Sequence, residues 1–346
     1  MTADVTRDDL ARLQDSLTST VADGAAPGGV LVYGSTTGTP AVLTAGIIAA
    51  ELGETAPDED TLYDIASLTK VVATWPLVGR ALAAGFLDLD QPVRNYLPPM
   101  SGETPSGQAT VRQLLAHTSG LRASTRLDLY RGSTAEPLHE LLCREPLEDV
   151  PGSHRYINRG YILLGLALAH VHGRPLDVLA SELWNGLGMQ ESQYGPVGRR
   201  PQVAPTEQRI PGAPRIWGAP HDDNAALMGG VAGHAGVFAT ARDLAAYATA
   251  LLTAYQDGDA LGLGAWLRNS LAPQAVIEPG LDRGLSWILA ADGHVMYHHG
   301  FTGTSLYLAP ESGRYLLILT NAVYNGQART RIAPLRALAL KTLSAT

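Results

Sequence analysis

The chain has 346 residues, of which 45% are hydrophobic and 17% charged, with 37 Gly and 22 Pro; this composition is typical of a folded globular protein. The net charge is −8 and no block of like charge occurs, so we expect no nucleic-acid partner, which would need a basic stripe. The longest apolar run, residues 161–169, is too short to cross a bilayer, so we expect no membrane partner.

The N-terminus differs from a secretory signal, because the first ten residues hold three acids and no apolar run. The single cysteine, Cys143, excludes an intramolecular disulfide. It lies in a Leu-Leu-Cys segment, where we expect a buried structural cysteine rather than a catalytic thiol. Both observations predict a cytoplasmic protein.

The first predicted element is an amphipathic helix. Thr6 and Asp9 have the spacing of a capping box, apolar residues follow at helical intervals, and the pattern ends near residues 23–24. Two β-rich runs come next, residues 29–33 and 41–45, separated by a turn-rich segment. We expect them to form a hairpin packed on the first helix.

Residues 61–252 read as mainly helical, with Pro- and Gly-rich connectors. Pro76 lies inside a helical stretch and predicts a kink or an early break there. The long irregular stretch from Gly195 to Pro220 is typical of a functional loop, and we expect it to wall a substrate cleft.

The C-terminal part returns to strands, predicted at 285–289, 295–298, 305–308 and 315–319, and ends in a helix over about 328–342. The two ends of the chain most simply share one antiparallel sheet. We therefore predict an α+β fold, with a sheet flanked by N- and C-terminal helices. Residues 1–60 and 255–346 would form the sheet domain, and residues 61–254 an inserted helical lobe.

The segment Ser67-Leu68-Thr69-Lys70 is the first candidate for chemistry. A helix beginning at Leu68 would put Lys70 one turn on, on the same face as Ser67. A serine hydroxyl attacks well only when a base takes its proton. Lys70 and Lys341 are the only lysines among 25 basic residues, and arginine cannot lose its proton as lysine can. Taken alone, the motif leaves a second interpretation open, in which Ser67 caps a helix and Lys70 is solvated.

Two further motifs follow in order: Tyr156-Ile157-Asn158, ahead of an apolar helix, and His298-His299-Gly300, at the end of a predicted strand. With Ser67-x-x-Lys70 they resemble the penicillin-recognising serine enzymes, in the branch of class C β-lactamases, D-alanyl carboxypeptidases and related esterases. The resemblance runs from about Gly24 to the C-terminus, and it includes the segments 81–98, 114–121 and 221–236.

The resemblance implies a β-lactamase/transpeptidase-like fold and a role for each matching residue. Ser67 would be the acylated serine and Lys70 its partner amine. Tyr156, with a phenol pKa lowered by nearby cations, would carry the proton to the leaving group. Asn158 would orient Lys70 and contact a substrate amide. The backbone N–H groups of Ser67 and Phe301 would form the oxyanion hole.

The third motif departs from the Lys-Thr-Gly of lactam-binding members. His298, His299 and Gly300 would still bind substrate, but a largely neutral imidazole holds a substrate carboxylate less well than lysine does. This favours an ester or amide that lacks the carboxylate.

Ten histidines also invite a metal interpretation. His170 and His172 would point to different faces of a helix, His298 and His299 to opposite faces of a strand, and no His-Glu-x-x-His segment occurs. We therefore expect no metal and no cofactor. Three further histidines are expected to be hydrogen-bonded structural or rim residues: His117, His221 and His234.

These observations predict serine-dependent acyl transfer through a Ser67 acyl-enzyme, acting on a small ester or amide in the cytoplasm. The acyl group would pass to water or to an amine or alcohol acceptor. By analogy with family members in high-GC bacteria, the role would be biosynthetic, as in nucleoside-antibiotic assembly. Two alternatives stay open: a D-alanyl carboxypeptidase or β-lactamase, and a non-catalytic ligand-binding module.

Overall fold

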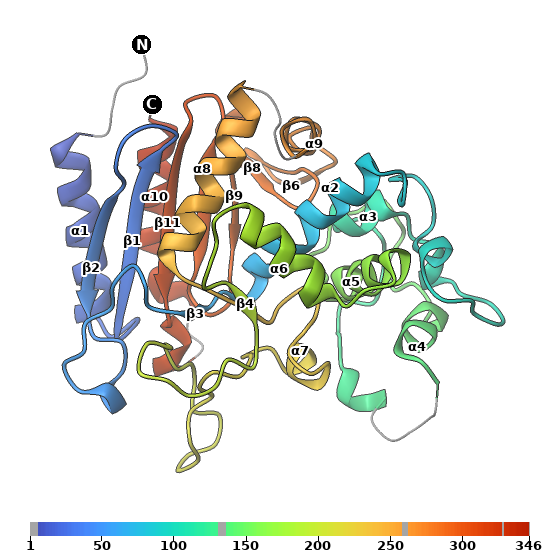
Figure 1. Ribbon diagram of the computed structural model, residues 1–346, viewed down its shortest axis with the longest axis horizontal. Helices are drawn as coiled ribbons and strands as arrows, with labels where there is room; N and C mark the ends of the chain where they lie inside the picture. The colour runs from blue at the N-terminus through green and yellow to red at the C-terminus, as the bar shows by residue number, and fades with distance from the viewer. Residues whose placement is uncertain (1–5, 131–135, 258–261, 327–328, 346) are drawn as a thin grey trace.

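The computed structural model describes residues 6–130, 136–257, 262–326 and 329–345. Its main feature is an eight-stranded sheet in the order β2-β1-β11-β10-β9-β8-β7-β6, in which neighbouring strands are antiparallel (Figure 1). Strands from both ends of the chain share this sheet, because β1 pairs with β11. The predicted α+β architecture is confirmed.

The N-terminal elements form as predicted. Helix α1 (Arg7–Ala22) begins at a complete capping box, in which the Thr6 side chain accepts from the Asp9 N–H and the Asp9 carboxylate accepts from the Thr6 N–H. Strands β1 (Gly28–Ser35) and β2 (Ala41–Gly46) form the predicted hairpin. Leu13 and Leu17 of α1 are fully buried against it.

The C-terminal strands are β9 (Val295–His299), β10 (Ser305–Ala309) and β11 (Arg314–Thr320), close to the predicted ranges. The predicted strand 285–289 is wrong at its start, since β8 covers only Ile288–Ala290. Ser286 has φ +78°, which no strand accommodates. Strands β6 (Ala275–Glu278) and β7 (Leu281–Arg283) were not predicted, because both are short and only partly buried.

The last helix, α10 (Ala333–Ser344), begins later than predicted, after a 3-10 turn at Arg329–Ile332. The predicted start at Ala328 lies outside the described residues. Pro334 in the first helical turn explains this start, since proline fits there but not in a helix interior.

The sheet is covered on both faces (Figure 1). Helices α1 and α10 pack on one face, and α8 (Ala241–Asp257) packs on the other, against β1 and β11. The helical region beside the sheet contains α2 (Trp75–Ala83), α3 (Val111–Leu115), α4 (Leu138–Arg144), α5 (Asn158–His172), α6 (Leu176–Gly186) and α7 (Asp223–Leu227), and α9 (Gly264–Ser270) packs on α8. The division into domains at residues 60–61 and 254–255 stays a prediction.

A small second sheet joins the helical region to the large one. It has the order β3-β5-β4, formed by Tyr63–Asp64, Val237–Ala239 and Gln193–Tyr194. Strand β3 leads directly into the segment that carries Ser67.

The backbone around Pro76 is irregular, as predicted. A π-helical turn, Lys70–Thr74, precedes Pro76, which occupies the first turn of α2. Because proline has no N–H, the carbonyl of Val72 lacks its usual helical partner, and it accepts instead from the indole of Trp184 at 3.0 Å.

Cys143 is fully buried, as predicted, and burial raises the pKa of its thiol to about 12. Within the described ranges, no single helix is long and apolar enough to span a membrane; α5 and α6 reach that length and composition only together, across an 85° bend.

Candidate active site

The turn that carries Ser67 is held in an unusual backbone conformation. Ser67 lies in a 3-10 turn, Ala66–Leu68, and Ala66 has φ +46°, a region that residues other than glycine rarely adopt. The Asp64 carboxylate accepts the Ala66 N–H at 2.8 Å and the His221 N–H at 2.7 Å. Burial raises the pKa of Asp64. The sequence patterns did not single out Asp64, whose role depends on these two backbone contacts.

Lys70 is fully buried and contacts three acceptors. Its Nζ lies 3.0 Å from Ser67 Oγ, 2.9 Å from Asn158 Oδ1 and 3.1 Å from the His234 carbonyl. The amide and main-chain oxygens can only accept hydrogen bonds. Of the three oxygens around Nζ, the Ser67 hydroxyl is the one that carries a proton, so it is the group from which a base at this position would take one.

Tyr156 lies over the same amine. The Nζ of Lys70 is 4.9 Å from the centre of the Tyr156 ring, which is 41% exposed. The buried His117 ring lies beside it, with centroids 4.5 Å apart, and His117 Nδ1 accepts the Ile157 N–H at 3.1 Å. His117 thus supports both the ring of Tyr156 and the backbone that follows, which fits its predicted structural role.

The third motif lies against the turn that carries Ser67. A Cβ on Gly300 would be 2.4 Å from the Ile65 carbonyl oxygen, so only glycine permits this approach. Thr302 and Thr304 donate to the carbonyls of Asp64 and Ile65, at 2.7 and 3.0 Å. Phe301, between them and Gly300, therefore lies next to the Ser67 turn, and the oxyanion hole that its N–H would share with Ser67 stays a prediction.

His298 and His299 point to opposite faces of β9, as predicted. His298 is buried on the side of the helical region, 6.1 Å from the Tyr156 ring between centroids. His299 lies on the α10 side, where its Nε2 is 2.9 Å from the Tyr307 hydroxyl. Burial holds the pKa of both rings well below the usual value, with Arg283 adding to the effect at His298 and Arg336 at His299. Both imidazoles are therefore neutral at pH 7.

The three motifs border a single cavity of about 770 Å³. All predicted site residues except Lys70 border it; Lys70 lies beneath, in contact with Ser67. The irregular 195–220 segment contributes Glu207, Gln208 and Arg209, so this loop walls the cavity, as expected. Arg283 and Arg336 also border it, and no sequence pattern predicted either of them.

Arg283 is a buried cation in the cavity wall. Its Nη1 donates to the Ser286 carbonyl at 3.0 Å, and its Nε lies 3.2 Å from His154 Nε2. Within the described part of the chain, nothing hydrogen-bonds to its Nη2. That nitrogen is a candidate donor to an anionic ligand group.

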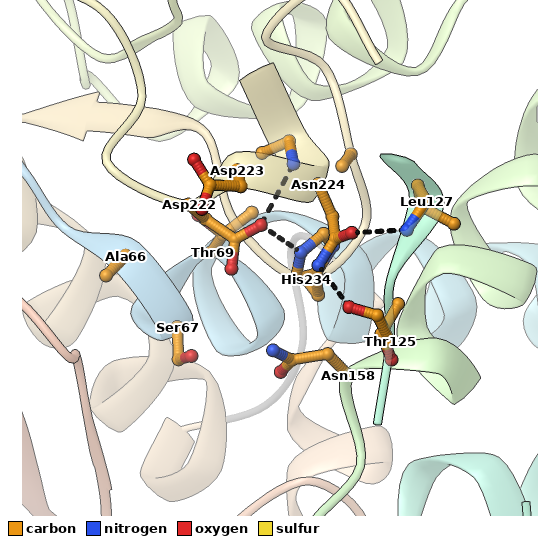
Figure 2. A network of polar contacts seen from close by, with 12 residues as sticks. Ala66, Ser67, Thr69, Thr125, Leu127, Asn158, Asp222, Asp223, Asn224 and His234 are labelled. Atoms are coloured by element: carbon orange, nitrogen blue, oxygen red, sulfur yellow. Dashed lines mark hydrogen bonds and ion pairs between the residues drawn. The ribbon is translucent and has the colours of Figure 1, made fainter. Parts of the chain in front are cut away.

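A contact between the ring of His234 and the half-buried Asp222 fixes the carbonyl that Lys70 uses. His234 Nε2 lies 2.8 Å from Asp222 Oδ1, and the same oxygen accepts the Ala225 N–H at 2.9 Å, capping α7 (Figure 2). Burial opposes ionisation of Asp222, but His234 and these hydrogen bonds outweigh it and lower its pKa. His234 is thus a structural histidine, as predicted.

Asn224, on α7, holds the loop that contains Thr125 and Leu127. The Asn224 side chain accepts the Leu127 N–H and donates to the Thr125 carbonyl, both at 3.0 Å (Figure 2).

The predicted rim residue His221 lies at the cavity edge, 3.0 Å from Glu207 and stacked on the Phe301 ring. In the described ranges, no three His, Cys, Asp or Glu side chains are grouped to hold a metal ion.

Comparison with known proteins agrees with this geometry. The beta-lactamase family model matches residues 13–341. A protein of Escherichia coli (strain K12) named "Putative D-alanyl-D-alanine carboxypeptidase" is 30% identical, over 75% of this chain and 69% of that protein. A protein of the same name from Salmonella typhi is 27% identical, over 80% of this chain and 72% of its own.

Two solved structures share the fold. The β-lactamase/D-alanine carboxypeptidase from Pseudomonas syringae superposes with a TM-score of 0.76 at 18% identity, over 96% of this chain and 99% of that one. EstCE1, described as a hydrolase with promiscuous acyltransferase activity, superposes with a TM-score of 0.75 at 18% identity, over 96% of this chain and 98% of that one.

Proposed function

The chain belongs to the beta-lactamase family and is a serine hydrolase of that superfamily; from this premise we propose that it forms an acyl-enzyme on Ser67 from a small ester or amide. The acyl group then passes to water or to an amine or alcohol. This proposal rests on the contact between Lys70 Nζ and Ser67 Oγ. The other two partners of the amine, Asn158 Oδ1 and the His234 carbonyl oxygen, can only accept hydrogen bonds.

The first half-reaction follows from the contacts of Lys70. The neutral amine takes the Ser67 proton as Oγ attacks the carbonyl carbon, forming the Oγ–C bond. The N–H groups of Ser67 and Phe301 would stabilise the oxyanion. As the bond to the leaving group breaks, Tyr156, over the amine, donates its phenol proton to the leaving atom and regains one from the Lys70 ammonium, which restores the neutral amine.

The second half-reaction repeats these steps with water or an acceptor. Its O–H or N–H proton passes through the Tyr156 hydroxyl to the Lys70 amine as its heavy atom attacks the acyl carbon, and Lys70 returns a proton to Ser67 Oγ when that ester breaks. A protein of the same fold is described as both hydrolase and acyltransferase, so the fold is compatible with both outcomes.

The test is covalent labelling. A fluorophosphonate should add to the peptide that contains Ser67, detected by mass spectrometry, and Ser67→Ala should abolish the adduct and the turnover of p-nitrophenyl acetate. Wild-type protein that stays unlabelled and inert with every ester tried would instead support the non-catalytic ligand-binding module. Product ratios with and without added alcohols or amines would separate transfer from hydrolysis.

A D-alanyl carboxypeptidase is the second candidate, and one observation favours it. Arg283 places a cation in the cavity wall, where it could hold the terminal carboxylate that the altered third motif grips less well. The curated relatives carry that name. Release of D-alanine from a peptide ending in D-Ala-D-Ala, lost in Arg283→Gln, would establish it; turnover of neutral esters alone would reject it. Penicillin hydrolysis tests the β-lactamase alternative in the same assay series.

The cellular setting proposed from the sequence is unchanged. We propose a cytoplasmic enzyme acting in small-molecule biosynthesis, such as nucleoside-antibiotic assembly. The products of the neighbouring genes would test this, because a biosynthetic cluster would supply both donor and acceptor.

A further inference from the structure

The buried side chain of Asp64 holds two segments that border the cavity beside Ser67. One carboxyl oxygen accepts the Ala66 N–H at 2.8 Å, and the other accepts the His221 N–H at 2.7 Å. Ala66 and His221 both line the cavity, whereas Asp64 is only 3% exposed and does not line it. Asp64 therefore meets no substrate and acts only through the residues that it holds.

The first of these contacts lies one residue before Ser67. Ala66 has φ +46°, a conformation that a residue other than glycine keeps only where the surrounding contacts impose it. The hydrogen bond from the Ala66 N–H to Asp64 is such a contact. Because the backbone angles of one residue orient the next peptide group, this bond also helps to set the direction of the Ser67 N–H.

Asp64 is also connected to the second predicted oxyanion donor, the N–H of Phe301. The backbone carbonyl of Asp64 accepts the hydroxyl of Thr302, the residue after Phe301, at 2.7 Å. The His221 ring stacks on the Phe301 ring, with centroids 5.3 Å apart, and the His221 N–H is held by the Asp64 carboxyl group. One buried residue thus links the segments that carry both predicted donors.

We propose that Asp64 is the positioning residue of the oxyanion hole and sets the direction of the Ser67 and Phe301 N–H groups. This inference rests on the proposed acyl transfer and identifies what holds its two backbone donors in place. Such donors stabilise a developing oxyanion only when they are already aimed at it. A change at Asp64 should therefore slow ester turnover through the two N–H groups.

The test replaces the oxygen atom that becomes the oxyanion. p-Nitrophenyl acetate is compared with its thiono analogue, whose C=S sulfur is a weaker hydrogen-bond acceptor. The ratio of kcat/KM for the two esters reports on the N–H donors and does not depend on the fraction of protein that is folded. If Asp64 contributed to stability alone, its replacement would leave this ratio unchanged.

Two variants disturb the two connections. Asp64→Asn keeps the shape of the side chain but turns an NH2 group toward one of the two backbone N–H groups. We expect kcat/KM for p-nitrophenyl acetate to fall about tenfold, part of what loss of a whole oxyanion donor costs, and the thiono ester to be affected much less. Thr302→Val removes the hydrogen bond to the Asp64 carbonyl and should lower the ratio in the same direction.

Asp243→Asn is the matched control. The Asp243 side chain also accepts two backbone N–H groups, those of Gln190 and Glu191, at 3.1 and 2.9 Å. Asp243 is 2% exposed and does not line the cavity beside Ser67. This variant should lose stability in urea unfolding and keep the wild-type ratio of the two esters.

The results separate this inference from the proposed function. A wild-type ratio in Asp64→Asn would overturn the role of Asp64 while acyl transfer stands, and so would an equal fall of the ratio in Asp243→Asn. If Asp64→Asn does not fold, the ratio in Thr302→Val decides in the same way. Absence of both turnover and Ser67 labelling in the wild-type protein would overturn the proposed function itself.

Discussion

The Nζ of Lys70 lies 3.1 Å from the main-chain carbonyl of His234, a residue 164 positions further along the chain. His234 is itself held through its ring by Asp222. With Asn158, this carbonyl gives the amine two acceptors besides Ser67. The position of the Lys70 amine thus depends on contacts far from its own motif.

Replacing Lys70 tests whether activity requires a side chain at this position that can lose a proton. We expect both Lys70→Ala and Lys70→Arg to lower kcat/KM for p-nitrophenyl acetate by about three orders of magnitude or more, because arginine keeps the charge but cannot act as a base. Steady-state assays measure this loss. Substantial activity in Lys70→Arg would show that the cation, rather than the free amine, is what Ser67 needs.

Asp222→Asn should reduce both activity and the acid sensitivity of stability. The folded-state pKa of Asp222 lies below its unfolded value of 3.8, so its stabilisation is complete above pH 3.8 and is lost as the pH falls below it. Urea unfolding from pH 3 to 7 should show a smaller acid-side loss in the variant than in wild type. We also expect kcat/KM to fall about tenfold, since the His234 carbonyl loses its anchor. Identical pH profiles would contradict the stabilising role assigned to the Asp222 carboxylate.

His117→Asn tests the support beneath Tyr156. Asparagine tolerates φ +58° and can still accept the Ile157 N–H, but it lacks the ring that packs on Tyr156. We expect kcat to fall about tenfold, with the fold retained by circular dichroism. Wild-type kinetics in this variant would show that the ring contact is dispensable.

The same variant should change the pH dependence of stability. Burial and the Arg283 guanidinium hold the pKa of His117 well below 6.5. The unfolded chain therefore takes up the proton first, so stability falls as the pH drops below 6.5. This loss is about 1.4 kcal/mol per pH unit for each such histidine, and the variant should lose one such contribution. Urea unfolding at pH 7 and 5.5 measures the difference.

Gly300→Ala should destabilise the protein and abolish activity. The added Cβ would lie 2.0 Å from Thr304 Oγ1 and 2.4 Å from the Ile65 carbonyl oxygen, so the segment after β9 must move away from the Ser67 turn. We expect a loss of about 1–3 kcal/mol in the free energy of unfolding, as in overpacked cores. Gly186→Ala is the matched control, because nothing lies within 4 Å of its Cβ. Equal stability of both variants would reject the close-approach argument.

Local patterns in the sequence determined the elements that depend on residues close together in the chain. The capping box at Thr6, the hairpin and the one-turn spacing of Ser67 and Lys70 each depend on neighbours within a few residues. The motif order was specific enough to predict which of these side chains meet. The strand predicted from residue 285 was wrong because Ser286, at φ +78°, hydrogen-bonds to Tyr161, far away in the chain.

Only the tertiary structure decided what surrounds the nucleophile. Asp64, Arg283 and Asp222 have no periodicity or spacing that marks them, and each acts through a partner more than ten residues away. The tautomer of the buried His298 ring is likewise invisible in the sequence, since it depends on the hydrogen bond from Nδ1 to the His299 carbonyl oxygen. The identity of each side chain supplies its chemistry, but contacts with other residues decide its charge, its tautomer and the direction in which it points.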